Sequence, residues 1–192
     1  HGGKDNGSDY RLRYEKNDNL KITQAVAAYL ADKENIQVIM TRSDDTFLSL
    51  EERTSFANQN NADYFVSLHR NTGEGNGVET WIRSDADDKT QALAKNIMDN
   101  LDAAGISRNR GVKKGTQKSE SKDYYVNLHT NMPACIVELG FMNSPTDNQL
   151  FDANVENYAK AIGDAVLKTY EAYGKDGADA TESVEDVPGT EE

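Results

Sequence analysis

Apolar residues recur every three to four positions in three stretches of the chain, which is the pattern of an amphipathic helix. These stretches are residues 20–32, 90–104 and 154–173. In the second, the expected buried stripe is Leu93, Ile97 and Leu101, and Gly105 supplies a stop. A fourth helix is predicted over residues 49–58, where Ser49 and Glu52 have the spacing of a capping box.

Short apolar runs rich in β-branched and aromatic residues predict strands at residues 36–41, 63–69, 77–82, 124–128 and 134–139. The run over 63–69 is almost continuously apolar, so we expect a strand buried on both faces. Residues 1–17 and 108–123 are polar and are expected to form loops. The alternation of strands and helices favours an α/β fold with a mainly parallel sheet covered on both faces.

Charge divides the 192 residues into a body and a tail. Residues 174–192 hold seven acids and one lysine, and hence −6 of the net charge of −12. They lack a periodic apolar face, so we expect an acidic disordered tail or linker after a single domain at residues 1–173. The body is only mildly acidic, which argues against nucleic-acid binding because that function needs a basic surface.

The single cysteine, Cys135, excludes an intrachain disulfide and is expected in the core of its apolar strand. The chain has no run of about 18 apolar residues, so no membrane-spanning helix is expected. It begins at His1 without an initiator methionine, which we interpret as the start of a trimmed product. The absence of a signal peptide from this sequence is therefore no evidence about where the protein acts.

Four residues are candidates for chemistry, and each has a simpler explanation. His69 ends an apolar strand, where ligands gather in α/β sheets, but a hydrogen-bonded histidine fits the same place. His1 lies in a glycine-rich loop, which permits close approach to a site, but an exposed histidine without a function fits the same place. Glu15 precedes a predicted helix, where a negative charge is favourable in any case.

Glu138 is harder to explain without a function, because it interrupts an apolar strand. A carboxylate in such a place is usually paired or functional, and a structural salt bridge is the competing explanation. Two histidines and one glutamate form a known catalytic zinc set with an open position for water. In that interpretation His1, Glu15 and His69 hold the metal and Glu138 takes the proton of the water.

Several blocks of sequence carry a resemblance to a known family. They run in order from residue 1 to about 173 and include His1-Gly2-Gly3-Lys4-Asp5, Ser67-Leu68-His69-Arg70-Asn71 and Val137-Glu138-Leu139-Gly140-Phe141. In these blocks the chain resembles the zinc-dependent N-acetylmuramoyl-L-alanine amidases of the Amidase_3 type. Such enzymes cut the amide between the lactyl group of N-acetylmuramic acid and L-alanine in peptidoglycan.

The resemblance implies one Zn²⁺ ion held by His1, Glu15 and His69, with Glu138 as the catalytic glutamate. It also implies a six-stranded sheet whose first strand precedes His1, and this chain lacks that segment. The expected fold is therefore α/β, with a twisted, mainly parallel sheet of about five to six strands and helices on both faces. Peptidoglycan is the expected partner of a monomeric bacterial protein that is secreted or associated with the cell wall.

Further residues receive less specific expectations. Asp5 is expected to orient a metal ligand, although it also suits a turn. Asn71 and Glu79 are expected to bind substrate. Asn71 also suits a group that orients a ligand or a turn residue, and a pair with a surface lysine fits Glu79 slightly better than a place in the groove. His129 is expected in a loop or at a strand edge.

Two other functions are compatible with the sequence. One is a non-catalytic peptidoglycan-binding or regulatory module of the same fold. The other is a different zinc peptidase that acts on free peptides. The four candidate residues argue against the first, and the products released from muropeptides would separate the second from an amidase.

Overall fold

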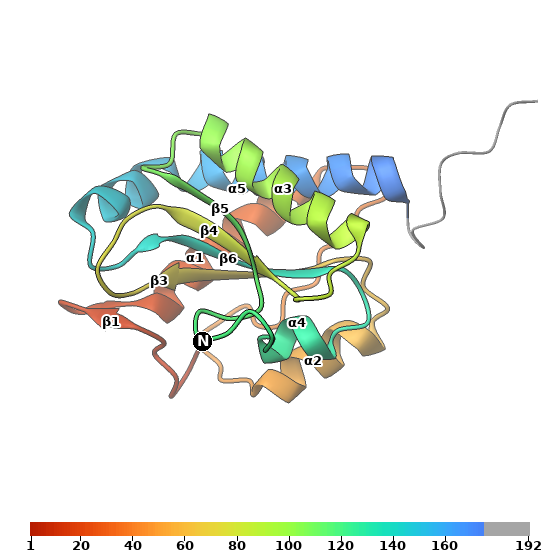
Figure 1. The fold of residues 1–192 in the computed structure, drawn as a ribbon, viewed down its shortest axis with the longest axis horizontal. Helices are drawn as coiled ribbons and strands as arrows, with labels where there is room; N and C mark the ends of the chain where they lie inside the picture. Colours follow the sequence, from red (N-terminus) through yellow and green to blue (C-terminus); the bar gives the residue numbers. More distant parts are fainter. Residues whose placement is uncertain (175–192) are drawn as a thin grey trace, which may run out of the picture.

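The computed structural model describes residues 1–174, so the predicted tail lies, apart from Gly174, outside the described residues. Its main sheet has four strands in the order β3-β6-β4-β5 (Figure 1). Their bounds are Phe65–Asn71 for β3, Ala134–Phe141 for β6, Val78–Ile82 for β4 and Asn109–Lys114 for β5. A separate two-stranded hairpin is formed by β1 (Asp9–Tyr10) and β2 (Arg13–Tyr14).

Two of the three pairings in the main sheet are parallel. Strand β3 pairs in parallel with β6, and β4 with β5, whereas β4 and β6 are antiparallel. The predicted α/β class and mainly parallel sheet are confirmed, but four strands are fewer than the five to six expected. The strand expected ahead of residue 1 stays a prediction.

Helices cover both faces of the sheet, as predicted (Figure 1). On one face lie α1, α3 and α5, and on the other lie α2 and α4. Their bounds are Glu15–Ala31 for α1, Leu50–Gln59 for α2, Asp88–Ala103 for α3, Tyr125–His129 for α4 and Pro145–Tyr173 for α5. None of the helices described between residues 1 and 174 combines the length and apolar character needed to cross a bilayer.

The core lies between the sheet and the layer of α1, α3 and α5. Leu93, Ile97 and Leu101 have no exposed surface, so the predicted stripe of α3 is confirmed. Full burial of each such side chain contributes about 1.5–3 kcal/mol. Cys135 is also fully buried, as expected. This packed layer makes the sheet a rigid base for side chains at its strand ends.

One helix start was predicted from its capping box, whereas other helices begin earlier than expected. The capping box of Ser49 and Glu52 is present at the start of α2. Helix α5, however, begins at Pro145, ahead of the predicted start at Asn154. The hydroxyl of Ser144 caps this end and proline suits the first helical turn, whereas Asn154 has non-helical φ and ψ and marks a kink. Helix α1 likewise starts early, at Glu15.

Four element predictions were wrong. The predicted loop over residues 1–17 contains the hairpin of β1 and β2 and the first residues of α1. Residues 36–41 form no strand and pair with none, and residues 39–42 line a pocket together with residues of β3. Residues 124–128 belong largely to helix α4, since a short apolar run does not distinguish helix from strand. The predicted loop over 108–123 contains β5, an edge strand whose polar sequence hid it.

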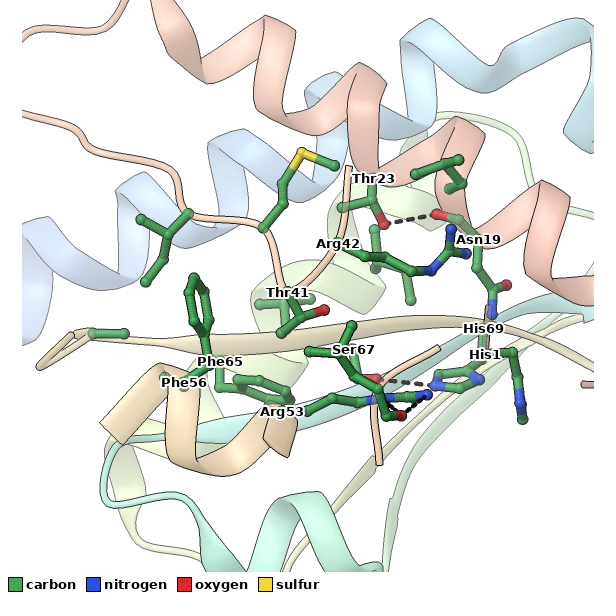
Figure 2. A pocket seen from close by; sticks show the side chains of 18 of the residues that line it. His1, Asn19, Thr23, Thr41, Arg42, Arg53, Phe56, Phe65, Ser67 and His69 are labelled. Carbon is green, nitrogen blue, oxygen red and sulfur yellow. Dashed lines mark hydrogen bonds between the residues drawn. The ribbon is translucent and has the colours of Figure 1, made fainter. Parts of the chain in front are cut away.

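The pocket along β3 has a volume of about 140 Å³. Its walls are partly apolar and partly polar, and the two histidines His1 and His69 lie together at one end (Figure 2). Phe65, Val66 and Ser67 of β3 are only half-buried because they line this pocket. The expectation that this strand is buried on both faces was therefore wrong for its first half.

Candidate metal centre and active site

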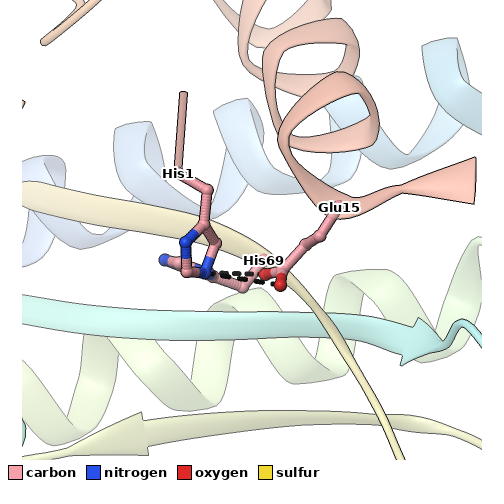
Figure 3. A group of neighbouring side chains, drawn as sticks. All are labelled: His1, Glu15 and His69. Atoms are coloured by element: carbon pink, nitrogen blue, oxygen red, sulfur yellow. Dashed lines mark hydrogen bonds and ion pairs between the residues drawn. The ribbon is translucent and has the colours of Figure 1, made fainter. Parts of the chain in front are cut away.

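His1, Glu15 and His69 come from three different elements and point toward one another (Figure 3). His1 lies in the first loop, Glu15 is the first residue of α1, and His69 lies in β3. One donor atom from each residue lies within 4.8 Å of the others. The structure therefore brings together all three residues that were expected to hold a metal.

Each carboxylate oxygen of Glu15 faces one imidazole. Glu15 Oε1 lies 2.8 Å from His69 Nδ1, and Oε2 lies 3.4 Å from His1 Nε2. Two imidazole nitrogens and a carboxylate are donors that zinc accepts, and three protein ligands leave a fourth position open. The donor set therefore fits a single zinc ion.

The remaining nitrogen of each imidazole already has a partner. His1 Nδ1 lies 2.7 Å from Asp5 Oδ2, and His69 Nε2 lies 2.9 Å from Ser67 Oγ. Such contacts fix the tautomer and the ring orientation of histidines that bind metals. Asp5 is thus placed as expected for a group that orients a ligand. Ser67 was overlooked, although its position two residues before His69 puts it on the same face of β3.

Glu15 is held in place by several donors and is almost fully buried. The backbone N–H of Ser8 donates to Oε2 at 2.8 Å, and that of Arg70 donates to Oε1 at 3.2 Å. Burial raises the pKa of Glu15, but the hydrogen bond to His69 and the charges of His69 and His1 outweigh it and lower the pKa to about 2. The carboxylate is therefore ionised at neutral pH.

Gly7 allows the first loop to close over this group. A Cβ atom at Gly7 would lie 2.6 Å from Glu15 Oε2 and 2.6 Å from His1 Cδ2, which is closer than real contacts allow. The residue also has a φ of 66°, in the left-handed region that favours glycine. Its role was not predicted, because one glycine in a glycine-rich loop resembles the others.

Glu138 lies in β6 beside His69 of β3, in register with it. Its Oε2 atom is buried and has no hydrogen-bond partner within the described residues. Burial raises the pKa of Glu138 to about 8, and the neighbouring charges of Glu15 and Glu79 add to this effect. No ion pair of Glu138 occurs in residues 1–174, so the structure gives no support to the salt-bridge explanation.

Glu79 continues this row onto β4, in register with Glu138. Its Oε1 accepts hydrogen bonds from Asn71 Nδ2 at 3.0 Å and Trp81 Nε1 at 3.1 Å. Its Oε2 accepts one from Arg110 Nε at 2.7 Å. The alternative of a surface lysine partner was wrong: Glu79 is buried and pairs with an arginine. Arg110 was overlooked because it lies in the segment expected to be a loop.

His129 stands apart from the metal-binding group. It is the last residue of α4, and its ring stacks on Tyr125 with 3.9 Å between the ring centroids. Its expected place in a loop or at a strand edge was therefore wrong. The stacking on Tyr125 accounts for the position of His129 without a role in the metal-binding group.

A model of the family described as N-acetylmuramoyl-L-alanine amidase matches residues 1–168. The chain belongs to this amidase family. The amidase is 35% identical over 176 residues to the uncharacterized protein YqiI of Bacillus subtilis, which covers 90% of this chain and 81% of that protein. It is 31% identical over 148 residues to the sporulation-specific N-acetylmuramoyl-L-alanine amidase of Bacillus subtilis, covering 77% of this chain and 55% of the relative.

Solved structures agree with this membership. An N-acetylmuramoyl-L-alanine amidase from Clostridium difficile 630 has a TM-score of 0.83 and 32% identity, covering 91% of this amidase and 94% of that chain. The catalytic domain of CwlV from Bacillus (Paenibacillus) polymyxa has a TM-score of 0.79 and 31% identity, covering 89% and 94%. The predicted family, fold class and enzyme class are confirmed. The amidase nevertheless spans only about half the length of the sporulation-specific relative.

Proposed function

We propose that residues 1–173 form a zinc-dependent catalytic domain that hydrolyses the amide between N-acetylmuramic acid and L-alanine in peptidoglycan. The observation that carries this proposal is the convergence of His1, Glu15 and His69 within 4.8 Å, beside the buried and unpartnered carboxylate of Glu138. A binding module has no need of a buried carboxylate without a partner, because burying it costs stability.

The three converging residues are proposed to hold the ion. Asp5 and Ser67 keep the two imidazoles oriented toward Glu15. When bound there, zinc supplies Lewis-acid polarisation of the scissile carbonyl and a lowered pKa for water. The ionised Glu15 offers its two oxygens to this position and contributes a negative charge that favours a divalent cation.

Glu138 is proposed to move the proton. In its ionised form it accepts a proton from the attacking water as the water oxygen bonds to the lactyl carbonyl carbon. It then gives that proton to the nitrogen of L-alanine as the C–N bond breaks, so the products are a carboxylic acid, which ionises in water, and a free amine. A raised pKa suits this exchange near neutral pH.

Asn71 and Glu79 remain candidates for substrate binding. Both are almost fully buried and hydrogen-bond to each other, which supports a role as the floor of the site. Arg110, which Glu79 holds, has more exposed surface, with 30% of its side chain accessible.

Place of action and assembly are also proposals. The chain is similar to a probable cell wall amidase, LytH, of Staphylococcus aureus, which supports action at the bacterial wall outside the cell. A monomer is proposed and can be checked by light scattering coupled to gel filtration. The family match ends at residue 168 and helix α5 at Tyr173, so a chain shortened after residue 174 is expected to keep its activity.

Purified muropeptides test the proposal. Incubation with the zinc-loaded protein is expected to release the whole stem peptide with a new amino terminus on L-alanine, and chelation followed by zinc should abolish and restore this release. Wall binding without release of amines would instead indicate a binding module. Release of single amino acids from the peptide end would indicate a peptidase of another specificity.

A further inference from the structure

Arg110 is held rigidly next to the row of carboxylates. Its Nε donates to Glu79 Oε2 at 2.7 Å, and its guanidinium lies over the ring of Phe141, with 5.0 Å from Cζ to the ring centroid. The backbone at Gly77 also lies close to this side chain, since a Cβ built on Gly77 would lie 3.1 Å from Arg110 Cδ. A carboxylate, an aromatic ring and a backbone therefore restrict this side chain together.

A bulge in β5 aims the side chain toward this position. Val78 pairs with Asn109 and Thr80 pairs with Val112, so Arg110 and Gly111 together face the single residue Glu79. Gly111 has a φ of 77°, which a residue with a side chain rarely adopts. Bulges are frequent beside active sites, where they redirect a side chain. The local backbone thus turns the guanidinium toward Glu79.

The terminal nitrogens of Arg110 are available as hydrogen-bond donors. Only Nε donates a hydrogen bond within the described residues, so Nη1 and Nη2 are without a hydrogen-bond acceptor in residues 1–174. The side chain is 30% exposed although its partner Glu79 is 3% exposed. An arginine that is anchored on one edge and open on the other is arranged to bind a carboxylate with two donors.

We propose that the Nη groups of Arg110 bind a carboxylate of the substrate on the leaving-peptide side of the scissile amide. The carboxylate that fits is the free α-carboxylate of the second residue of the stem peptide, a glutamate linked through its side chain. This inference rests on the proposed amidase function. It makes the enzyme selective against peptidoglycan in which that carboxylate is amidated.

The spacing agrees with this assignment. Neighbouring strands lie about 4.8 Å apart, so Glu79, two strands from His69, lies about 10 Å from it. An extended peptide advances about 3.5 Å per residue, which puts the α-carboxylate of the second stem residue about 7 Å from the scissile carbonyl. The two lengths are of similar size, and the guanidinium of Arg110, which is hydrogen-bonded to Glu79, supplies the donors for that carboxylate.

Two synthetic muramoyl tripeptides that end in a lysine amide test the proposal. One carries D-glutamate with a free α-carboxylate and the other carries D-isoglutamine, in which that group is an amide. The intact zinc-loaded protein is expected to cleave the first with a kcat/KM about 10-fold to 100-fold higher, the effect of one charge-assisted hydrogen bond. In Arg110→Gln this ratio is expected to fall to about one, and Arg110→Lys should restore part of it.

Arg83→Gln is the matched control, because Arg83 follows β4 and pairs with the exposed Asp85. It should keep the selectivity of the parent. If Arg110→Gln fails to fold, the double change Glu79→Gln/Arg110→Gln removes both charges of the pair and should show the same lost ratio. Equal cleavage of both tripeptides by the parent, or an unchanged ratio in Arg110→Gln, overturns this inference alone. Cleavage of neither tripeptide at the muramoyl amide overturns the proposed function itself.

Discussion

Glu138 lies directly beside His69 across the parallel pair of β3 and β6. Residues in register on neighbouring strands present their side chains on one face of the sheet, about 4.8 Å apart. The separation between a proposed metal ligand and the proposed base is therefore set by the backbone of the sheet. Glu79 on β4 extends the same row, so three charged or ionisable side chains share one rigid face.

Glu138→Gln is expected to abolish turnover and leave zinc binding intact, because this side chain is not in the donor set. The loss of a general acid and base typically lowers the rate about 10²-fold to 10⁴-fold. Release of stem peptides and metal content by atomic absorption should be measured on the same sample. Glu156→Gln, an exposed change on α5, is the control. A Glu138→Gln protein with near-normal turnover would falsify the assigned role.

The stability of the metal-free protein should depend on pH through Glu138. Its pKa is raised from 4.5 to about 8, so between these values the folded state keeps a proton that the unfolded state has released. The free energy of unfolding that the neutral carboxyl contributes is fully present below pH 4.5 and is lost as the pH rises toward about 8. Glu138→Gln cannot ionise and should remove this loss.

Urea unfolding in the presence of a chelator checks this dependence. The denaturation midpoint of the parent should fall from about pH 5 to about pH 8 more steeply than that of Glu138→Gln. The comparison isolates Glu138, since other titrating groups are common to both proteins. Parallel curves for the two proteins would show that the carboxylate is not destabilised by burial.

The proposed reactive residues could be recognised from the sequence because each breaks a local rule. Glu138 interrupts an apolar strand and His69 ends one, and neither residue suits a plain buried strand. The α/β class followed from the alternation of periodic segments in the same way. Such signals reside in a few neighbouring residues and need no knowledge of the tertiary fold.

What the sequence did not predict depends on contacts between distant segments. Ser67 and Arg110 matter only because of the side chains they meet, namely His69 and Glu79. The strand predicted over residues 36–41 had the right local pattern but lacks a neighbour to pair with. Local propensity cannot supply that neighbour, since pairing is decided by the whole sheet.

Asp5→Ala is expected to weaken zinc binding about 10-fold to 100-fold, the usual effect of losing a partner that orients a ligand. Asp5 Oδ2 holds His1 Nδ1, and Oδ1 accepts the backbone N–H of Gly7. Affinity can be measured by competition with a chromophoric chelator. Asp9→Ala, an exposed change in the hairpin, should bind zinc like the parent. Equal affinities of the two variants would show that His1 needs no such support.

Gly7→Ala should damage the metal centre more than the fold. The added Cβ would lie 2.6 Å from Glu15 Oε2 and from His1 Cδ2, so one of the two donors must move away. We expect zinc affinity to fall at least about 10-fold, since binding depends on the positions of all three donors.

Gly105→Ala separates this effect from backbone strain. Gly105 also has a positive φ, of 89°, but a Cβ there meets nothing within 4 Å. Both variants should lose about 1–2 kcal/mol of unfolding free energy in the metal-free state, because a side chain in the left-handed region is strained. Only Gly7→Ala should also lose zinc affinity and turnover. If it binds zinc as tightly as Gly105→Ala, the first loop does not position His1 against Glu15 in the way the structure indicates.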